Sequence, residues 1–286
     1  MQITKPKDVN AKIVYIRSNG SKEPLLIVSP KDKKPDSPGI LWIHGGGYFL
    51  GMKEMVYMSR AINLVRKYNA VVVSPGYRLA FHAPYPAALT DCYHGLLYMK
   101  KHASELGIRE DQLMVGGESA GGGLCAAVCI AARDKGQVNV AYQMPLYPML
   151  DNHDTESSRD NHGRVWNTGR NHFGWKMYLR KDAKNQVSPY ASPAGCRNYS
   201  GLPPAYTFVG DGEPFYTETC KYIRDLKDAG TEAFIDVYPT NIHAFDIIYP
   251  NSESSKEAAS KFEAHFEYAL EHYFAPQQEG AARDLY

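Results

Sequence analysis

Short apolar runs that lack polar alternation recur along this chain, and segments with helical spacing separate them. The clearest runs lie at residues 40–43, 70–74 and 113–116. Continuous apolar runs of this kind are typical of strands buried on both faces of a parallel sheet. Further strands are predicted at residues 140–146, 206–209 and 234–238, and helices at about 55–68, 86–103, from 119 onward, 215–229 and 254–273. This alternation predicts an α/β fold with a mostly parallel central sheet.

The beginning of the chain and one central segment depart from this alternation. Two β-rich runs at residues 13–17 and 25–29 flank Ser18-Asn19-Gly20, which predicts a hairpin. With it the sheet has about eight strands. Residues 151–184 are polar and aromatic, and they predict a small lid or cap inserted in a single domain of residues 1–286. A long surface excursion is the alternative for this segment.

Composition excludes several classes of protein. The 286 residues include 32 basic and 31 acidic side chains, which gives a net charge of +1. A nucleic-acid-binding protein would have an excess of positive charge on one face, so this class is not favoured. No apolar run approaches the roughly 20 residues of a membrane span. Five cysteines without CxxC spacing argue against a disulfide framework or a zinc cage, and favour a reducing, cytoplasmic setting.

Two glycine-rich motifs point to nucleophilic catalysis. Gly117-Glu118-Ser119-Ala120-Gly121 is a G-x-S-x-G sequence between a predicted strand and a predicted helix. In that context its glycines permit a tight turn that exposes the serine hydroxyl. His44-Gly45-Gly46-Gly47 follows the strand at residues 40–43. Such a loop supplies backbone N–H groups to an oxyanion, so His44 itself is expected to shape the loop rather than act as a base.

A nucleophilic serine needs a base and an acid that orients the base. His243 follows the last predicted strand, whereas His265 and His272 lie in the predicted C-terminal helix, so His243 is the predicted base. Asp211 and Glu213 both follow the strand at 206–209, and their spacing alone does not choose between them.

The chain resembles the hormone-sensitive-lipase-like branch of bacterial esterases in the α/β-hydrolase superfamily. The matching blocks are HGGGYFLG (44–51), YRLAFHAPYPAALTD (77–91), GESAGGG (117–123), GEPFYTE (212–218) and HAF (243–245). The resemblance implies the α/β-hydrolase fold, and it makes Glu213 the triad acid. It also implies oxyanion donors at the N–H groups of Gly46, Gly47 and Ala120, and a homodimer.

Four departures from the family pattern bear on specificity. Glu213 replaces the usual Asp, Phe81-His82 stand where Pro-Glu is usual, and Ala244 replaces Gly. Many relatives carry additional N-terminal cap helices, whereas only 43 residues precede His44 and they read as strands. Residues 151–184 would then be the whole cap, which implies a shallow pocket and short acyl chains.

The expected activity is a serine carboxylesterase that hydrolyses small-molecule acetyl to butyryl esters without a metal or an organic cofactor. Because His243 must be neutral, activity should rise with pH through roughly 6–7. Tyr48, Trp166 and Phe215 are the candidate pocket residues. Trp166, Trp175 and Tyr178 suggest acetylated carbohydrates as substrates, unless these rings merely pack the lid onto the body. The rival interpretations are an amide or formamide hydrolase with the same triad, and a non-catalytic ligand receptor.

Overall fold

An eight-stranded sheet runs through the computed structural model, which describes residues 3–180 and 187–278. The strand order is β1-β2-β4-β3-β5-β6-β7-β8. Strand β2 pairs antiparallel with β1 and with β4, and all other neighbours are parallel. The strands are β1 (Val9–Ser18), β2 (Ser21–Pro30), β3 (Ser37–Ile43), β4 (Val71–Pro75), β5 (Ile108–Glu118), β6 (Tyr142–Leu146), β7 (Ala205–Gly210) and β8 (Ala233–Tyr238). The predicted sheet is therefore confirmed.

The predicted hairpin closes at the expected turn. Asn19 and Gly20 both have positive φ, +47° and +83°, and Ser18 pairs with Ser21 across them. Two central residues with positive φ give the turn whose twist matches the flanking strands. The strands extend beyond the predicted runs at both ends because their ladder of ten pairs continues through polar residues.

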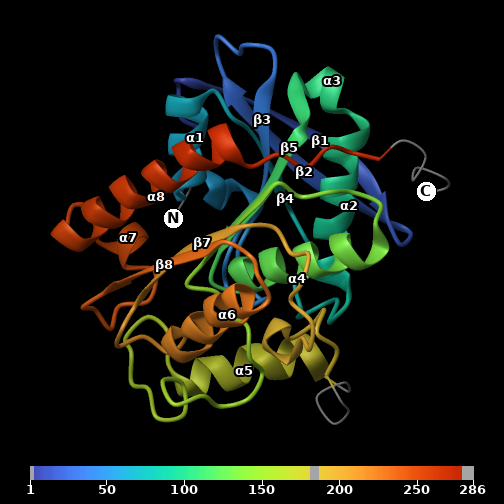
Figure 1. The fold of residues 1–286 in the computed structure, drawn as a ribbon. Helices are drawn as coiled ribbons and strands as arrows, with labels where there is room; N and C mark the ends of the chain where they lie inside the picture. Colours follow the sequence, from blue (N-terminus) through green and yellow to red (C-terminus); the bar gives the residue numbers. More distant parts are fainter. Residues whose placement is uncertain (1–2, 181–186, 279–286) are drawn as a thin grey trace.

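Helices cover both faces of the sheet, because its central strands are apolar on both sides. In β3 the side chains of Leu41 and Ile43 join one buried cluster, and those of Ile40 and Trp42 join the other. Helices α2, α4 and α6 contribute to the first cluster and α1 and α8 to the second, on opposite sides of the sheet (Figure 1). The helices are η1 (Lys53–Met58), α1 (Ala61–Tyr68), α2 (Ala87–Lys101), α3 (Ala103–Leu106), α4 (Ala120–Lys135), α5 (Thr168–Leu179), η3 (Pro193–Gly195), α6 (Tyr216–Asp228), α7 (Phe245–Ile248) and α8 (Glu253–His272).

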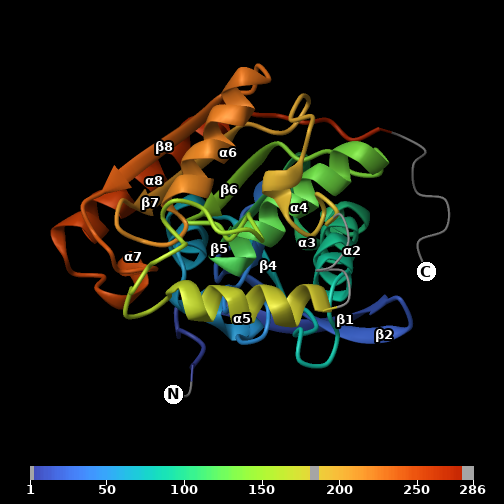
Figure 2. The same ribbon diagram turned by 90° about the horizontal axis from the view of Figure 1, so that it is seen from below.

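The segment predicted as a cap contains α5, which the sequence pattern did not predict. Asn167 caps this helix by accepting a hydrogen bond from the Arg170 N–H. Tyr178 stacks on Tyr48 with ring centroids 4.0 Å apart, and Trp175 lies 5.3 Å from the same ring. Figure 2, which views the molecule from below, shows α5 in front of the strands. Residues 181–184 of the predicted cap lie outside the described residues.

None of the helices in the described ranges is both long and apolar enough to cross a lipid bilayer.

Candidate active site

Four loops meet at one edge of the sheet because they follow parallel strands. Strands β3, β5, β7 and β8 all run in the same direction, so their carboxyl ends share an edge. Ligands bind at this edge in open parallel sheets. The loops after these four strands carry His44, Ser119, Glu213 and His243 respectively.

Ser119 occupies a strained turn between β5 and α4. Its φ is +58° and its ψ is −121°, in a region that L-residues rarely adopt. The two glycines of the motif make the turn possible: a Cβ on Gly121 would overlap the Ile43 carbonyl, and one on Gly117 would lie 2.5 Å from the Gly121 carbonyl oxygen. The turn therefore places the hydroxyl at the N-terminus of α4, as the motif predicts.

A chain of buried hydrogen bonds links Ser119, His243 and Glu213. The Ser119 hydroxyl lies 2.8 Å from His243 Nε2, and His243 Nδ1 is hydrogen-bonded to Glu213 Oε2. Glu213 Oε1 accepts a hydrogen bond of 2.9 Å from the Gly210 N–H. Because the carboxylate accepts the Nδ1 proton, Nε2 is left free to accept the proton of the serine hydroxyl.

Asp211, the alternative acid, points elsewhere. It is exposed, and its Oδ1 accepts a hydrogen bond of 3.1 Å from the Thr240 N–H, whereas Glu213 is fully buried. The two carboxylates were equivalent by spacing, and the structure brings only Glu213 to His243. Asp211 braces the loop that leads from β8 to His243.

The loop after β3 turns sharply at its glycines. Gly46 and Gly47 have φ values of +116° and +60°, and the Gly46 carbonyl accepts the N–H groups of Phe49 and Leu50. A Cβ on Gly46 would overlap the Leu50 carbonyl, and one on Gly47 would overlap the Trp166 ring. Ala120 is the first residue of α4, where N–H groups have no acceptor within the helix.

His44 supports this loop and is not placed to act as a base. It is buried, and burial lowers its pKa to about 4, so it is neutral at pH 7. Its Nδ1–H donates to the Gly45 carbonyl, and its ring stacks on Tyr77 with centroids 4.2 Å apart. The Tyr77 hydroxyl donates to the His44 carbonyl. The structure thus agrees with the loop-shaping role predicted for His44.

The three candidate pocket residues lie at different distances from the chemistry. The Phe215 ring lies edge-on to His243 at 5.0 Å, and the Trp166 ring is 6.3 Å from His243 and covers Gly47. Tyr48 is buried, and its hydroxyl donates to the Met149 carbonyl. Trp166 and Phe215 therefore flank the imidazole, whereas Tyr48 packs against α5.

A buried charged cluster beneath the site went unpredicted. Asp246 pairs with Arg60 at 2.9 Å and accepts the Tyr147 hydroxyl at 2.9 Å. The Tyr147 ring lies edge-on to His243 at 5.1 Å. Glu118, the variable residue of the G-x-S-x-G motif, accepts the Trp42 indole N–H at 2.9 Å. Burial, followed by the charge of Asp246, raises the pKa of Glu118 to about 8.

The raised pKa makes Glu118 a source of pH-dependent instability. The folded state holds the proton more tightly than the unfolded chain, whose carboxyl titrates near the ordinary value of 4.5. Stability from this group is complete below pH 4.5 and is lost as pH rises toward 8. Glu118→Gln keeps the acceptor for Trp42 and removes the titration. We expect the free energy of unfolding of Glu118→Gln, relative to that of wild type, to increase from pH 4.5 to pH 8 by on the order of 4 kcal/mol. Each pH unit between the two pKa values is worth about 1.4 kcal/mol, and titration is only half complete at each end.

Urea unfolding of both proteins at pH 4.5, 6 and 8 checks this prediction. The control is Glu110→Gln, which alters an exposed carboxylate. If the difference in free energy of unfolding between Glu118→Gln and wild type did not change with pH, as is expected for the control, the raised pKa of Glu118 would be contradicted.

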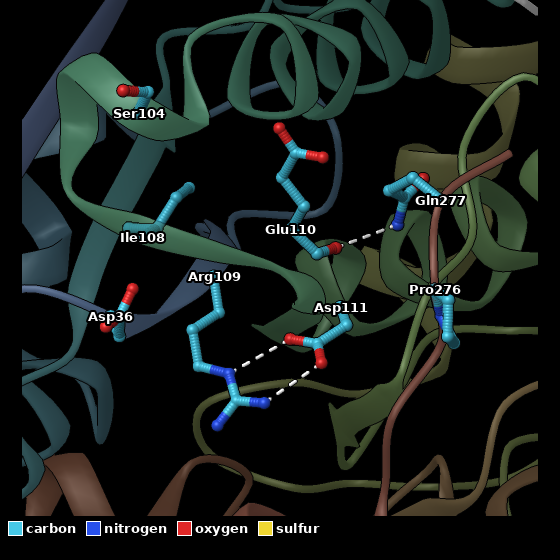
Figure 3. A pocket seen from close by; sticks show the side chains of 8 residues that line it. All are labelled: Asp36, Ser104, Ile108, Arg109, Glu110, Asp111, Pro276 and Gln277. Atoms are coloured by element: carbon cyan, nitrogen blue, oxygen red, sulfur yellow. Dashed lines mark hydrogen bonds and ion pairs between the residues drawn. The ribbon is translucent and has the colours of Figure 1, made fainter. Parts of the chain in front are cut away.

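A hollow lies far from these residues, at the amino end of β5 (Figure 3). Part of its polar lining is paired within the hollow: Arg109 pairs with Asp111 at 2.9 Å, and the Gln277 side chain donates to the Glu110 carbonyl. Figure 1 places α3, which leads into this hollow, at the opposite end of the molecule from α5. It is therefore separate from the candidate active site. Within the described ranges no group of three or more His, Cys, Asp or Glu side chains is arranged to hold a metal ion.

Comparison with known proteins agrees with this architecture. Residues 40–247 match a family described as alpha/beta hydrolase fold. An arylesterase of Saccharolobus solfataricus is 30% identical over 225 residues, 78% of this chain and 72% of the relative. An ethyl acetate hydrolase of Pseudomonas putida is 27% identical over 234 residues, 79% of this chain and 72% of the relative. The solved structure of a bacterial heroin esterase superposes with a TM-score of 0.87 at 30% identity, and covers 92% of this chain and 85% of that one.

Fold, site geometry and relatives together define an ester hydrolase of the serine type that acts on small-molecule esters. The chain belongs to the α/β-hydrolase fold family, in its hormone-sensitive-lipase-like branch of esterases.

Proposed function

We propose that this chain is a carboxylesterase for acetyl to butyryl esters, with Ser119 as nucleophile, His243 as base and Glu213 as orienting acid. The observation that carries the proposal is the buried hydrogen-bonded chain from Ser119 through His243 to Glu213. It lies beside the glycine loop that follows β3.

In the first step His243 Nε2 takes the proton of the Ser119 hydroxyl while Oγ attacks the ester carbonyl carbon. The carbonyl oxygen becomes an oxyanion, which accepts hydrogen bonds from the N–H groups of Gly46, Gly47 and Ala120. Such donors stabilise the charge only as it develops, so they lower the barrier rather than merely tighten binding. Glu213 holds the imidazole in the required tautomer and stabilises the imidazolium.

The tetrahedral intermediate collapses when the imidazolium returns its proton to the leaving alcohol oxygen. Ser119 is then acylated. Water enters, His243 removes one of its protons, and the resulting attack releases the carboxylic acid and restores the serine hydroxyl. Every proton transfer in this cycle uses the same nitrogen, Nε2 of His243.

Two features support short acyl chains. Ser119 is buried, with 7% of its surface exposed, and the Trp166 ring covers the adjacent Gly47. Next to Gly47 in the chain, the buried Tyr48 ring is packed against the rings of Tyr178 and Trp175. The relative from Pseudomonas putida carries the name ethyl acetate hydrolase, which fits a two-carbon acyl group.

The carbohydrate hypothesis loses its main support. Trp175 and Tyr178 are 4% and 1% exposed, so their faces pack the cap onto the body and are not offered to a sugar ring. We therefore keep simple alkyl and aryl esters as the proposed substrates.

Hydrolysis of p-nitrophenyl acetate, butyrate, octanoate and palmitate tests the acyl preference. We expect kcat/KM to fall at least about tenfold between butyrate and octanoate, because each methylene without room must displace packed side chains. A maximum at octanoate or longer would refute the short-acyl proposal. p-Nitroacetanilide serves as the matched amide, and faster hydrolysis of it than of the acetate ester would favour the amidase interpretation.

A further inference from the structure

Four aromatic side chains form a continuous cluster that begins at the candidate active site and ends in water. Phe49 lies at its centre, 5.0 Å from Phe173, 5.6 Å from Phe81 and 6.3 Å from Trp166. Phe81 and Phe173 are 6.3 Å apart. The outer two rings are 46% and 43% exposed. Adjacent phenylalanines with this much exposed surface are typical of a binding site rather than of packing alone.

The inner end of this aromatic cluster touches the catalytic groups. Trp166 lies 6.3 Å from His243 and covers Gly47, and the Phe49 ring lies 2.9 Å from where a Cβ on Gly47 would be. Ring-to-ring contacts therefore lead from His243 and the glycine loop to the surface without a polar side chain among the four.

The chemistry of the reaction decides which part of an ester meets these rings. His243 must protonate the leaving oxygen, so the alcohol part of the ester lies beside the imidazole when the intermediate collapses. Trp166, Phe215 and Tyr147 are aromatic neighbours of that imidazole, and among them Trp166 is the member of the cluster. The cluster continues outward from Trp166, which places it on the alcohol side of the substrate.

The backbone of the loop that carries the exposed Phe81 is held by hydrogen bonds. Arg180, which follows α5, donates hydrogen bonds of 2.8 Å and 2.6 Å to the carbonyls of Ala80 and Phe81. The loop that carries Phe81 is thereby fixed to the same segment that carries Phe173. A surface positioned before the ligand arrives binds with less loss of entropy.

We propose that Phe81 and Phe173, backed by Phe49, form a subsite for an aromatic ring in the alcohol part of the ester. This inference rests on the proposed esterase function and deepens it. The Phe49 ring meets both outer rings at 85–87°, so an aromatic ligand on the outer rings extends a set of edge-to-face contacts. Each such contact favours an aromatic ring over a saturated one of similar size by a factor of about 2–10.

Benzyl acetate, cyclohexylmethyl acetate and ethyl acetate test the subsite, because the three share an acyl group and release unactivated primary alcohols. For the wild type we expect kcat/KM for benzyl acetate to exceed that for cyclohexylmethyl acetate about tenfold, mainly through KM. Phe81→Ala and Phe173→Ala should each lower this ratio toward one, and Phe81→Tyr should retain it. Phe274→Ala is the matched control, since Phe274 is 43% exposed and lies against Arg109, remote from the site.

Equal ratios in wild type, Phe81→Ala and Phe173→Ala would overturn the proposal. So would a preference seen only with methyl phenylacetate over methyl cyclohexylacetate, which would move the aromatic site to the acyl side. A readout without turnover separates this inference from the proposed function: saturation-transfer NMR of benzyl acetate with Ser119→Ala. If Ser119→Ala shows a saturation-transfer signal from the ring protons of benzyl acetate and the added Phe81→Ala substitution abolishes it, the subsite is supported even if the wild type hydrolyses no ester. If the signal is unchanged by Phe81→Ala, the subsite is refuted.

Discussion

Replacing Ser119 by alanine is expected to lower kcat for p-nitrophenyl acetate by about 10⁴–10⁶-fold. The substitution removes the only atom that attacks the carbonyl in the proposed cycle, and His243 is left without a proton to accept. The glycine loop and the pocket remain, so substrate still binds and a small residual rate over water persists. KM should change little, because the Ser119 hydroxyl contributes to the transition state and not to the bound ester.

Steady-state kinetics and covalent labelling together test this expectation. Ser37→Ala is the control: Ser37 is also buried, and its hydroxyl donates to the Lys34 carbonyl at the amino end of β3, the opposite edge of the sheet from Ser119. An organophosphate should transfer one dialkylphosphoryl group to the Ser119 oxygen of the wild type, with release of its leaving group, and none to Ser119→Ala. A variant that keeps more than about 1% of the wild-type rate, or a label found on another residue, would remove Ser119 from the role of nucleophile. Absence of any labelling in a folded wild type would favour the receptor interpretation.

Strands and helices with strong local signals were predictable from sequence. Strands β3 and β4 are fully buried. Burial on both faces requires consecutive apolar residues, and such runs can be recognised in the sequence. The hairpin was predictable because Asn19 and Gly20 are residues that tolerate positive φ. Helix α5 was missed because its buried residues mix polar and aromatic types, and no clear apolar stripe separates the two faces.

The candidate site was predictable where a motif fixes the backbone, and unpredictable where distant segments meet. The glycines around Ser119 and in the loop after β3 are needed because an added Cβ would overlap neighbouring backbone atoms or, at Gly47, the Trp166 ring. Asp246 and Arg60, by contrast, are separated by 186 residues and meet only through the fold. Phe81 lies in a loop and Phe173 in α5, and nothing near either residue in the sequence indicates the other.

Glu213→Gln is expected to lower kcat by about 10³–10⁴-fold, and the reason lies in its second oxygen. Oε1 accepts the Gly210 N–H while Oε2 faces His243 Nδ1. A glutamine that keeps its carbonyl oxygen on Gly210 must turn its NH₂ group toward Nδ1. The NH₂ group only donates, so the imidazole must accept at Nδ1 and carry its proton on Nε2. That tautomer cannot take the proton of Ser119.

A series of three variants separates this charge-and-tautomer role from simple geometry. Asp211→Asn should keep kcat within about threefold, because Asp211 contacts Thr240 and not His243. Glu213→Asp retains the charge but is one methylene shorter, so it cannot reach Gly210 and His243 at once, and a loss of about 10²-fold follows from that misplacement. The expected order of activity is therefore Asp211→Asn, then Glu213→Asp, then Glu213→Gln, measured on proteins whose thermal unfolding shows them folded. If Asp211→Asn were the most damaged of the three, the acid would be Asp211 and the buried bond to Glu213 would be structural. If Glu213→Gln were as active as Glu213→Asp, the tautomer argument would fail, because glutamine keeps the length of the side chain and loses its charge, whereas aspartate keeps the charge and loses the length.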